Sequence, residues 1–260
     1  MLLASALPYF TVSFRFGPLQ LYAWMLIGGL LLGGLAMVYA SRRYALPAGD
    51  VIALAGVLVV ASFVGAHLFD IVANQLDDAK HDAALWWQLW KGISLLGALA
   101  TMAIVTFAWA RVRDLPLAKL ADCVALGWLV ALVIGRIGCA LVHDHLGTPT
   151  TLPIGIDFPP HAVWQLDNDG PMRLHDLGFE ELLVAIPLCV VMWLIARRLK
   201  PGMTAVLTAL VYAPIRFGLD FLRLPEPDVR FAALTGAQWG CIAMTGLAVF
   251  SVTRLQRSSG

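Results

Sequence analysis

The chain has 260 residues, of which 60% are hydrophobic and 13% are charged, and its formal net charge is +1. Soluble domains are about 45 to 50% apolar and about 25% charged, so the composition excludes an ordinary soluble domain and indicates an integral membrane protein. The near-zero net charge, with no basic stripe interleaved with aromatic residues, argues against a nucleic-acid partner. The four cysteines lack the close spacing of a zinc site and are predicted to be buried free thiols.

Apolar segments of about 20 residues, long enough to cross a bilayer, follow one another along the chain. We expect the first eighteen residues to form a short interfacial helix ahead of them. The spans are predicted at 19–40, 51–73, 86–110, 120–142, 179–196, 203–222 and 232–252. The predicted fold is therefore an all-α integral membrane protein, a bundle of about seven transmembrane helices that forms a single domain over residues 1–260.

The longest loop, between the predicted fourth and fifth helices, is rich in proline and glycine. This composition predicts a small irregular or short-stranded cap over residues 143–178 rather than a helix.

Positive charges in the loops predict the orientation of the protein in the membrane. Ten lie on one side, namely Arg42, Arg43, Arg111, Arg113, Lys119, Arg197, Arg198, Lys200, Arg254 and Arg257, and five on the other, namely Arg15, Lys80, Arg173, Arg223 and Arg230. The bias predicts a cytoplasmic carboxyl terminus, an extracytoplasmic amino terminus and an extracytoplasmic cap.

The first predicted span carries Gly29 and Gly33, four residues apart. Small residues at this spacing allow two helix backbones to approach closely in a membrane. We therefore expect the first helix to pack tightly against a neighbour along this face.

Residues 135–147 combine an arginine at membrane depth with two histidines around a carboxylate: Arg136, His143, Asp144 and His145. An arginine inside a bilayer costs several kcal/mol unless it pairs, reaches water or binds a ligand, so the stretch predicts a functional site. The alternative is that Arg136 is a structural ion-pair partner. His143 and His145, with nearby Asp144 and Asp176, make a metal site conceivable, but their spacing provides no third ligand. We expect neither a metal nor a cofactor.

A second polar face lies in the predicted sixth helix, where Arg216, Asp220 and Arg223 follow in steps of four and three residues. Such a face inside an apolar segment must point into the bundle or a water-filled cavity. Together with Arg136 it predicts an excess of buried positive charge, and guanidinium groups bind phosphate in a bidentate way. The anion available in a bilayer is a phospholipid headgroup.

These residues carry a resemblance to the prolipoprotein diacylglyceryl transferase family, seven-helix enzymes of the bacterial inner membrane. Residues 135–147, with Arg136, Asp144 and Gly147, resemble the family signature Gly-Arg-x-Gly-Asn-Phe-x-Asn-x-Glu-x-x-Gly. Further matches are spread over nearly the whole chain and comprise Phe16-Gly17-Pro18 with Tyr22, His175 with Glu181, Arg216-Phe217, Arg223, Gly236 and Gln238.

The chain also departs from the family pattern. Cys139 and Val142 stand where the signature has asparagines, and Asp144 replaces a glutamate. Leu96 occupies the position of the histidine in the family's His-Gly-Gly segment, which is held to assist thiol activation. The departures indicate a divergent branch in which His143 or His145 acts as the base.

The resemblance implies transfer of the diacylglyceryl group of phosphatidylglycerol to the cysteine thiol of a lipoprotein precursor, or to another thiol acceptor, with release of glycerol phosphate. Arg136 and Arg216 are the expected ligands of the phosphate, and His143, His145 and Asp144 complete the catalytic set. For Asp144 a role that only fixes Arg136 is left open. Residues expected to bind or position the substrate are Tyr22, Arg223, Asp220, Cys139, His175 and Glu181.

Two other classes of function are considered. A phospholipid-binding protein could have kept the charged cavity and lost the chemistry together with the family's histidine. An anion transporter should show inverted repeats, which the sequence does not display.

Overall fold

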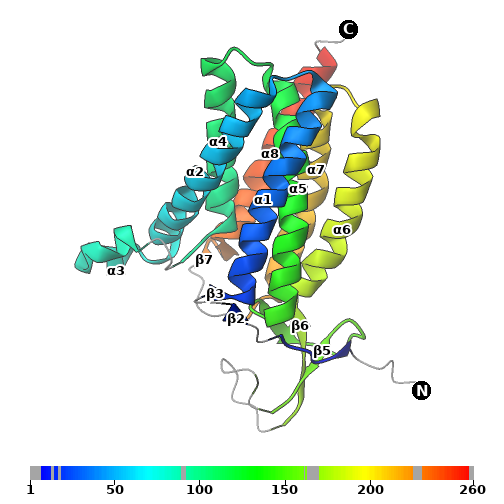
Figure 1. Cartoon of the computed structure of the whole chain (residues 1–260). Helices are drawn as coiled ribbons and strands as arrows, with labels where there is room; N and C mark the ends of the chain where they lie inside the picture. The colour runs from blue at the N-terminus through cyan, green and yellow to red at the C-terminus, as the bar shows by residue number, and fades with distance from the viewer. Residues whose placement is uncertain are drawn as a thin grey trace.

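The computed structural model describes residues 7–12, 15–16, 19–88, 92–160, 162, 170–224 and 230–257. Long helices dominate this part of the chain and run alongside one another (Figure 1). They are α1 (Leu21–Ser41), α2 (Ala48–Asn74), α4 (Leu95–Val112), α5 (Leu117–Val142), α6 (Leu177–Ile195), α7 (Met203–Leu219) and α8 (Gly236–Arg257). Within the described ranges, the first six are long and apolar enough to cross a membrane. The prediction of an all-α integral membrane protein is confirmed, and the predicted seventh span corresponds to α8.

The predicted span 86–110 is wrong at its start, because α4 begins at Leu95. Before it lie the short helix α3 (Leu76–His81) and the 3-10 helix η2 (Ala83–Trp87). The tryptophans made the segment look apolar, but the Trp87 side chain is 82% exposed. The helix begins where Ser94 caps it: the Ser94 Oγ accepts a hydrogen bond from the Gly97 backbone N–H at 3.4 Å, and serine is a favoured N-cap residue.

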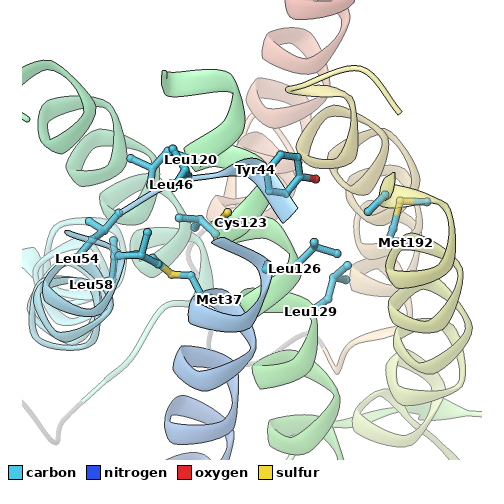
Figure 2. Close-up of a cluster of buried hydrophobic side chains, with 14 of the residues drawn as sticks. Met37, Tyr44, Leu46, Leu54, Leu58, Leu120, Cys123, Leu126, Leu129 and Met192 are labelled. Carbon is cyan, nitrogen blue, oxygen red and sulfur yellow. The ribbon is translucent and has the colours of Figure 1, made fainter. Parts of the chain in front are cut away.

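Glycines bring α1 and α5 into backbone contact, as their spacing in α1 predicts. A Cβ added at Gly33 would lie 2.8 Å from the Gly127 carbonyl oxygen, and one added at Gly127 would lie 2.6 Å from the Gly33 carbonyl oxygen. Around this contact, apolar side chains of α1, α2, α5 and α6 form the main core, which Figure 2 shows from Met37 on α1 to Met192 on α6. The contact fixes α5, the helix that carries Arg136.

Replacing Gly127 by alanine is therefore expected to destabilise the protein by about 1 to 3 kcal/mol, because the new methyl group meets backbone that cannot rotate away. Thermal unfolding of the purified protein in detergent measures the effect. The matched control is Gly28→Ala, since a Cβ at Gly28 meets nothing within 4 Å. Equal melting temperatures for the two variants would contradict the close packing of α1 on α5.

The loop between α5 and α6 forms strands. A four-stranded sheet has the order β1-β5-β6-β4, built from β1 (Leu7–Pro8), β4 (Leu146–Pro149), β5 (Ile156–Phe158) and β6 (Met172–Asp176). β1 pairs with β5 in parallel, and the other two pairings are antiparallel. The strands lie at one end of the bundle, and the carboxyl end of α8 lies at the other (Figure 1).

The expected interfacial helix at the amino end is wrong for the described residues 7–12 and 15–16, none of which is helical. β1 joins the sheet, and β2 (Arg15–Phe16) pairs with β3 (Leu19–Gln20) just before α1. Residues 1–6, 13–14 and 17–18 of the predicted helix lie outside the described residues. The remaining short elements are η1 (Arg42–Tyr44), η3 (Ala196–Arg198), η4 (Asp220–Leu222), β7 (Arg230–Phe231) and β8 (Leu234–Thr235).

A buried carboxylate on α5 fixes the start of α7. Asp122 is 0% exposed and accepts hydrogen bonds from the backbone N–H groups of Gly202 at 2.8 Å and Ala205 at 2.9 Å. The first backbone N–H groups of a helix have no hydrogen-bond partner within that helix. Asp122, on the neighbouring helix α5, accepts hydrogen bonds from two such groups at the start of α7. This contact ties α7, which carries Arg216, to α5, which carries Arg136.

Candidate functional site

A cavity of about 430 Å³ lies between α1, α2, α4, α5, α7 and α8. Its walls are mainly apolar, with side chains such as Leu30, Leu58, Leu99 and Leu132. The polar groups that line it include Tyr22, Arg136, Cys139, His145, Arg216, Arg223 and Thr235. Arg136 is six residues before the end of α5, about 9 Å along the helix, so this polar set lies toward the end of the bundle that carries the sheet. The cavity is thus apolar along most of its length and charged at one end.

Glu181 on α6 joins the two predicted arginines. Its Oε2 lies 3.0 Å from the Arg136 Nη2 and 3.6 Å from the Arg216 Nε. Arg136 is 7% exposed and Glu181 is 3% exposed, so the cluster is buried between α5, α6 and α7. The structure therefore brings together the guanidinium groups of two helices that are 80 positions apart in the sequence.

Further hydrogen bonds fix the carboxylates. The Tyr212 hydroxyl donates to the Glu181 Oε1 at 2.6 Å, and the Arg216 Nη1 lies 2.9 Å from the Asp220 Oδ1. The Thr235 hydroxyl donates to the Asp220 Oδ2. Each carboxylate thus has one oxygen held by a hydroxyl group and the other beside an arginine, and this network favours one geometry.

The predicted excess of positive charge is not found at this cluster. Arg136 and Arg216 face Glu181 and Asp220, two carboxylates for two guanidinium groups. The sequence named Glu181 as a substrate-binding candidate but not as the partner of both arginines, because that contact depends on where α6 packs. The buried cluster is electrically balanced, and any ligand has to bind to donors that the carboxylates leave free.

Such donors exist on Arg136. Its Nε is buried without a hydrogen-bond partner in the structure, and its Nη1 contacts the Cys139 Sγ at 3.5 Å. A guanidinium group carries five N–H donors, and a buried donor without a partner costs about 1 to 3 kcal/mol. Arg136 is thus held by Glu181 while its Nε keeps an unused donor.

The carboxyl end of α5 turns sharply at His143, which has a φ of 53° and caps the helix in the left-handed conformation. Its Nδ1 donates to the Asp176 Oδ2 at 2.5 Å and its Nε2 to the Phe10 carbonyl oxygen at 2.9 Å. Both partners are acceptors, which favours the imidazolium. Burial disfavours that form, but the hydrogen bond and charge of Asp176 outweigh burial and raise the pKa of His143 above its ordinary value.

The turn separates the two predicted histidines. His143 binds the sheet and the amino-terminal segment and is not among the residues that line the cavity, whereas His145 does line it. The His145 Nδ1 donates to the Asp144 Oδ1 at 2.6 Å. The side chains of Cys139, Asp144 and His145 place one ligand-type atom each within 4.8 Å of one another.

The other predicted residues fall into two groups. Tyr22, Cys139 and Arg223 line the cavity, and Asp220 supports Arg216. His175 is not brought to the cavity: it is 6% exposed, and its Nδ1 donates to the Glu180 Oε1 at 2.6 Å beside the sheet.

Sequence reasoning gave no role to three residues that build the site, Tyr212, Thr235 and Gln238, although Gln238 is among the matches to the family pattern. The Gln238 Oε1 accepts from the Thr235 backbone N–H at 3.0 Å, which orients the threonine that donates to Asp220. Tyr212 had a signal in the sequence, because it precedes Arg216 and Asp220 by steps of four residues on the same helical face. Thr235 had none, since it lies in a short strand that only the fold brings beside Asp220.

The fold and the site define a multi-pass membrane protein with a buried ionic cluster at one end of an apolar cavity. A sequence model described as prolipoprotein diacylglyceryl transferase matches residues 11–254, and the chain belongs to this family of transferase enzymes. Proteins named phosphatidylglycerol–prolipoprotein diacylglyceryl transferase are similar to it. One from Coxiella burnetii is 29% identical over 237 residues, 85% of each chain. One from Methylococcus capsulatus is 27% identical over 263 residues, 95% of this chain and 97% of the relative.

Proposed function

We propose that the protein transfers the diacylglyceryl group of phosphatidylglycerol to a thiol acceptor, the signal-sequence cysteine of a lipoprotein precursor, and releases glycerol phosphate. The observation that carries the proposal is the pairing of an apolar cavity with two guanidinium groups at one end. A phospholipid has the same division, since its acyl chains are apolar and its phosphate is a bidentate acceptor for arginine.

In the proposed reaction, the acceptor sulfur forms a bond to the glyceryl carbon while the bond from that carbon to the phosphate oxygen breaks. Negative charge grows on the departing glycerol phosphate, and Arg136 and Arg216 stabilise it. Charged donors held in a site that excludes water stabilise such charge more than they would in water. Arg223, which also lines the cavity, assists, and Tyr22 positions the headgroup.

The thiol must lose its proton, because the thiolate is the nucleophile. His145 is our candidate for the base, since it lines the cavity and its Nδ1 donates to Asp144. That hydrogen bond leaves Nε2 as the acceptor nitrogen of the neutral ring. His143 is assigned as a positioning residue that holds the turn through Asp176 and Phe10.

The proposed orientation puts the sheet end of the bundle outside the cytoplasm in a bacterial inner membrane. The helix ends that carry most of the loop arginines and lysines lie at the opposite end, together with the carboxyl end of α8 (Figure 1). Short loops with excess positive charge stay in the cytoplasm. Residues 143–178 then form an extracytoplasmic cap on a single transmembrane domain.

The direct test incubates purified protein in detergent with phosphatidylglycerol and a peptide that contains a lipoprotein signal-sequence cysteine. Mass spectrometry should find the peptide with one diacylglyceryl group in thioether linkage, together with free glycerol phosphate. A peptide with serine in place of the cysteine is the control and should stay unmodified. If no product forms from either peptide while phosphatidylglycerol stays intact, the proposed reaction is refuted.

A second candidate is a phospholipid-binding protein without transferase activity. Leu96 favours it, because this side chain lines the cavity and packs on Gly240 at the position where the family resemblance expects a histidine. If the base was lost there, a Leu96→His variant should gain transfer activity that the wild type lacks, measured in the same peptide assay. If His145 is the base, the wild type is active, and Leu96→His should raise the transfer rate by no more than about twofold. A general base that had been missing would raise that rate by about 100-fold or more.

A further inference from the structure

We propose that Cys139, Asp144 and His145 form a binding site for a thiophilic divalent metal ion, with one open coordination position toward the cavity. The three side chains offer one sulfur, one oxygen and one nitrogen ligand atom, all within 4.8 Å of one another. Within the described residues, no other group of three such side chains comes as close. A set of one thiolate, one imidazole and one carboxylate suits Zn²⁺ and Co²⁺.

Small movements complete the geometry. Ligand atoms of a tetrahedral zinc ion lie roughly 3.3 to 3.6 Å apart, given zinc–ligand distances of about 2.0 to 2.3 Å. The side chains of Asp144 and His145 are 31% and 27% exposed, so both have room to change rotamer. Cys139 lies on the rigid helix α5 and is 4% exposed. A fixed sulfur thus faces two adjustable ligands.

The backbone of this turn is fixed on both sides of Asp144. His143 adopts the left-handed conformation that ends α5, and its N–H donates to the Cys139 carbonyl oxygen at 2.8 Å. The His145 carbonyl oxygen accepts from the Leu177 N–H at 2.9 Å. Because the turn is held at both ends, residues 144 and 145 stay beside Cys139 without a metal, which lowers the cost of assembling the site.

The local charge also permits a cation. Arg136 contacts the Cys139 Sγ at 3.5 Å, but Glu181 already balances this guanidinium at 3.0 Å. A thiolate and a carboxylate together carry two negative charges, which a divalent ion neutralises. The Arg136 N–H then donates to the metal-bound sulfur, the kind of outer contact that orients metal ligands.

Metal binding should inhibit the transfer reaction, an expectation that rests on the proposed function. A metal ion bound by Asp144 and a ring nitrogen of His145 replaces the hydrogen bond between these two side chains, and that hydrogen bond is what orients His145 as the proposed base. Zn²⁺ should therefore block the reaction reversibly, and a chelator should restore it. The family signature has asparagine at the position of Cys139. The expected inhibition by Zn²⁺ therefore results from a departure of this chain from the family pattern.

The binding test uses full-length protein freed of any histidine tag and treated with a chelator, then titrated with Co²⁺ alone. We expect about one bound ion per chain and a sulfur-to-cobalt charge-transfer absorption, and Zn²⁺ should displace the cobalt. Cys139→Asn and His145→Ala should each weaken Co²⁺ binding at least about 100-fold. Removing a residue that only supports a metal ligand costs up to about 100-fold in affinity, and these variants remove a ligand itself. Cys241→Ala, which removes another thiol of the cavity lining, should change neither signal.

The proposal is overturned if the wild type shows no sulfur-to-cobalt absorption, or if Cys139→Asn binds Co²⁺ as tightly as the wild type. Melting temperatures measured in chelator show whether each variant still folds, and Cys139→Ser serves as a second variant if Cys139→Asn does not. The binding readout needs no transferase activity, so a failure of the proposed reaction leaves it interpretable. If diacylglyceryl transfer continues at a Zn²⁺ concentration that displaces all of the bound cobalt, the inhibition is refuted but the metal site is not.

Discussion

Replacement of Arg136 by alanine is expected to lower the rate of diacylglyceryl transfer by about 100- to 1,000-fold, the range seen when one preorganised donor to a developing anion is removed. Arg136 has a buried Nε without a hydrogen-bond partner, and its side chain lines the cavity. The loss should fall mainly on kcat, because the leaving phosphate gains charge only in the transition state. Release of glycerol phosphate from phosphatidylglycerol measures it.

Two variants make this result specific. Arg136→Lys keeps the charge but lacks the planar fork, so it should recover only part of the lost activity. Arg113→Ala removes an arginine that pairs with Asp50 and is 53% exposed in its side chain, at the carboxyl end of α4 away from the cluster. It should keep wild-type activity. Equal activity of Arg136→Ala and Arg113→Ala would contradict the role of Arg136.

Replacement of Glu181 by glutamine is expected to destabilise the protein by about 3 to 5 kcal/mol, the usual cost of removing one partner from a buried ion pair. The change keeps the shape of the side chain and its contact with the Tyr212 hydroxyl, but it leaves Arg136 and Arg216 facing each other with only Asp220 in support. Thermal unfolding in detergent should show the loss as a large fall in melting temperature.

A double variant separates charge from packing. Adding Arg136→Gln to Glu181→Gln removes the uncompensated guanidinium group. The double variant should therefore be more stable than Glu181→Gln alone. Asp157→Asn, which disrupts an exposed pair with Arg173, is the control and should leave the melting temperature unchanged within error. If Glu181→Gln melts like this control, Glu181 does not hold the two arginines.

The membrane helices could be predicted because their signal is local. A run of about 20 apolar residues is visible in any window, and six such helices are present in the described chain. The error at the start of α4 has a local cause too, since Trp87 is apolar in composition but exposed in the fold. Ser94, the residue that caps α4, would have given the correct boundary.

The candidate site was predicted in part, because its arginines carry a signal in the sequence, whereas the contact of both arginines with Glu181 carries none. An arginine inside an apolar span requires an explanation wherever it points, so Arg136 and Arg216 stood out. The bridge through Glu181 depends on how α6 packs, and the opposite directions of His143 and His145 depend on one residue with positive φ. The spacing of residues in the sequence predicts neither of these two features. It also does not predict that Asp144 and His145 lie close to Cys139.

In the proposed complex the guanidinium groups of Arg136 and Arg216 bind the phosphate of one phospholipid molecule. An experimental structure of the protein with phosphatidylglycerol would show this contact. We predict phosphate density within about 2.7 to 2.9 Å of nitrogen atoms from both arginines, with the acyl chains along the apolar walls of the cavity. Lipid density whose phosphate contacts neither arginine, with the Arg136–Glu181–Arg216 cluster unchanged, would show that these arginines do not bind the phosphate.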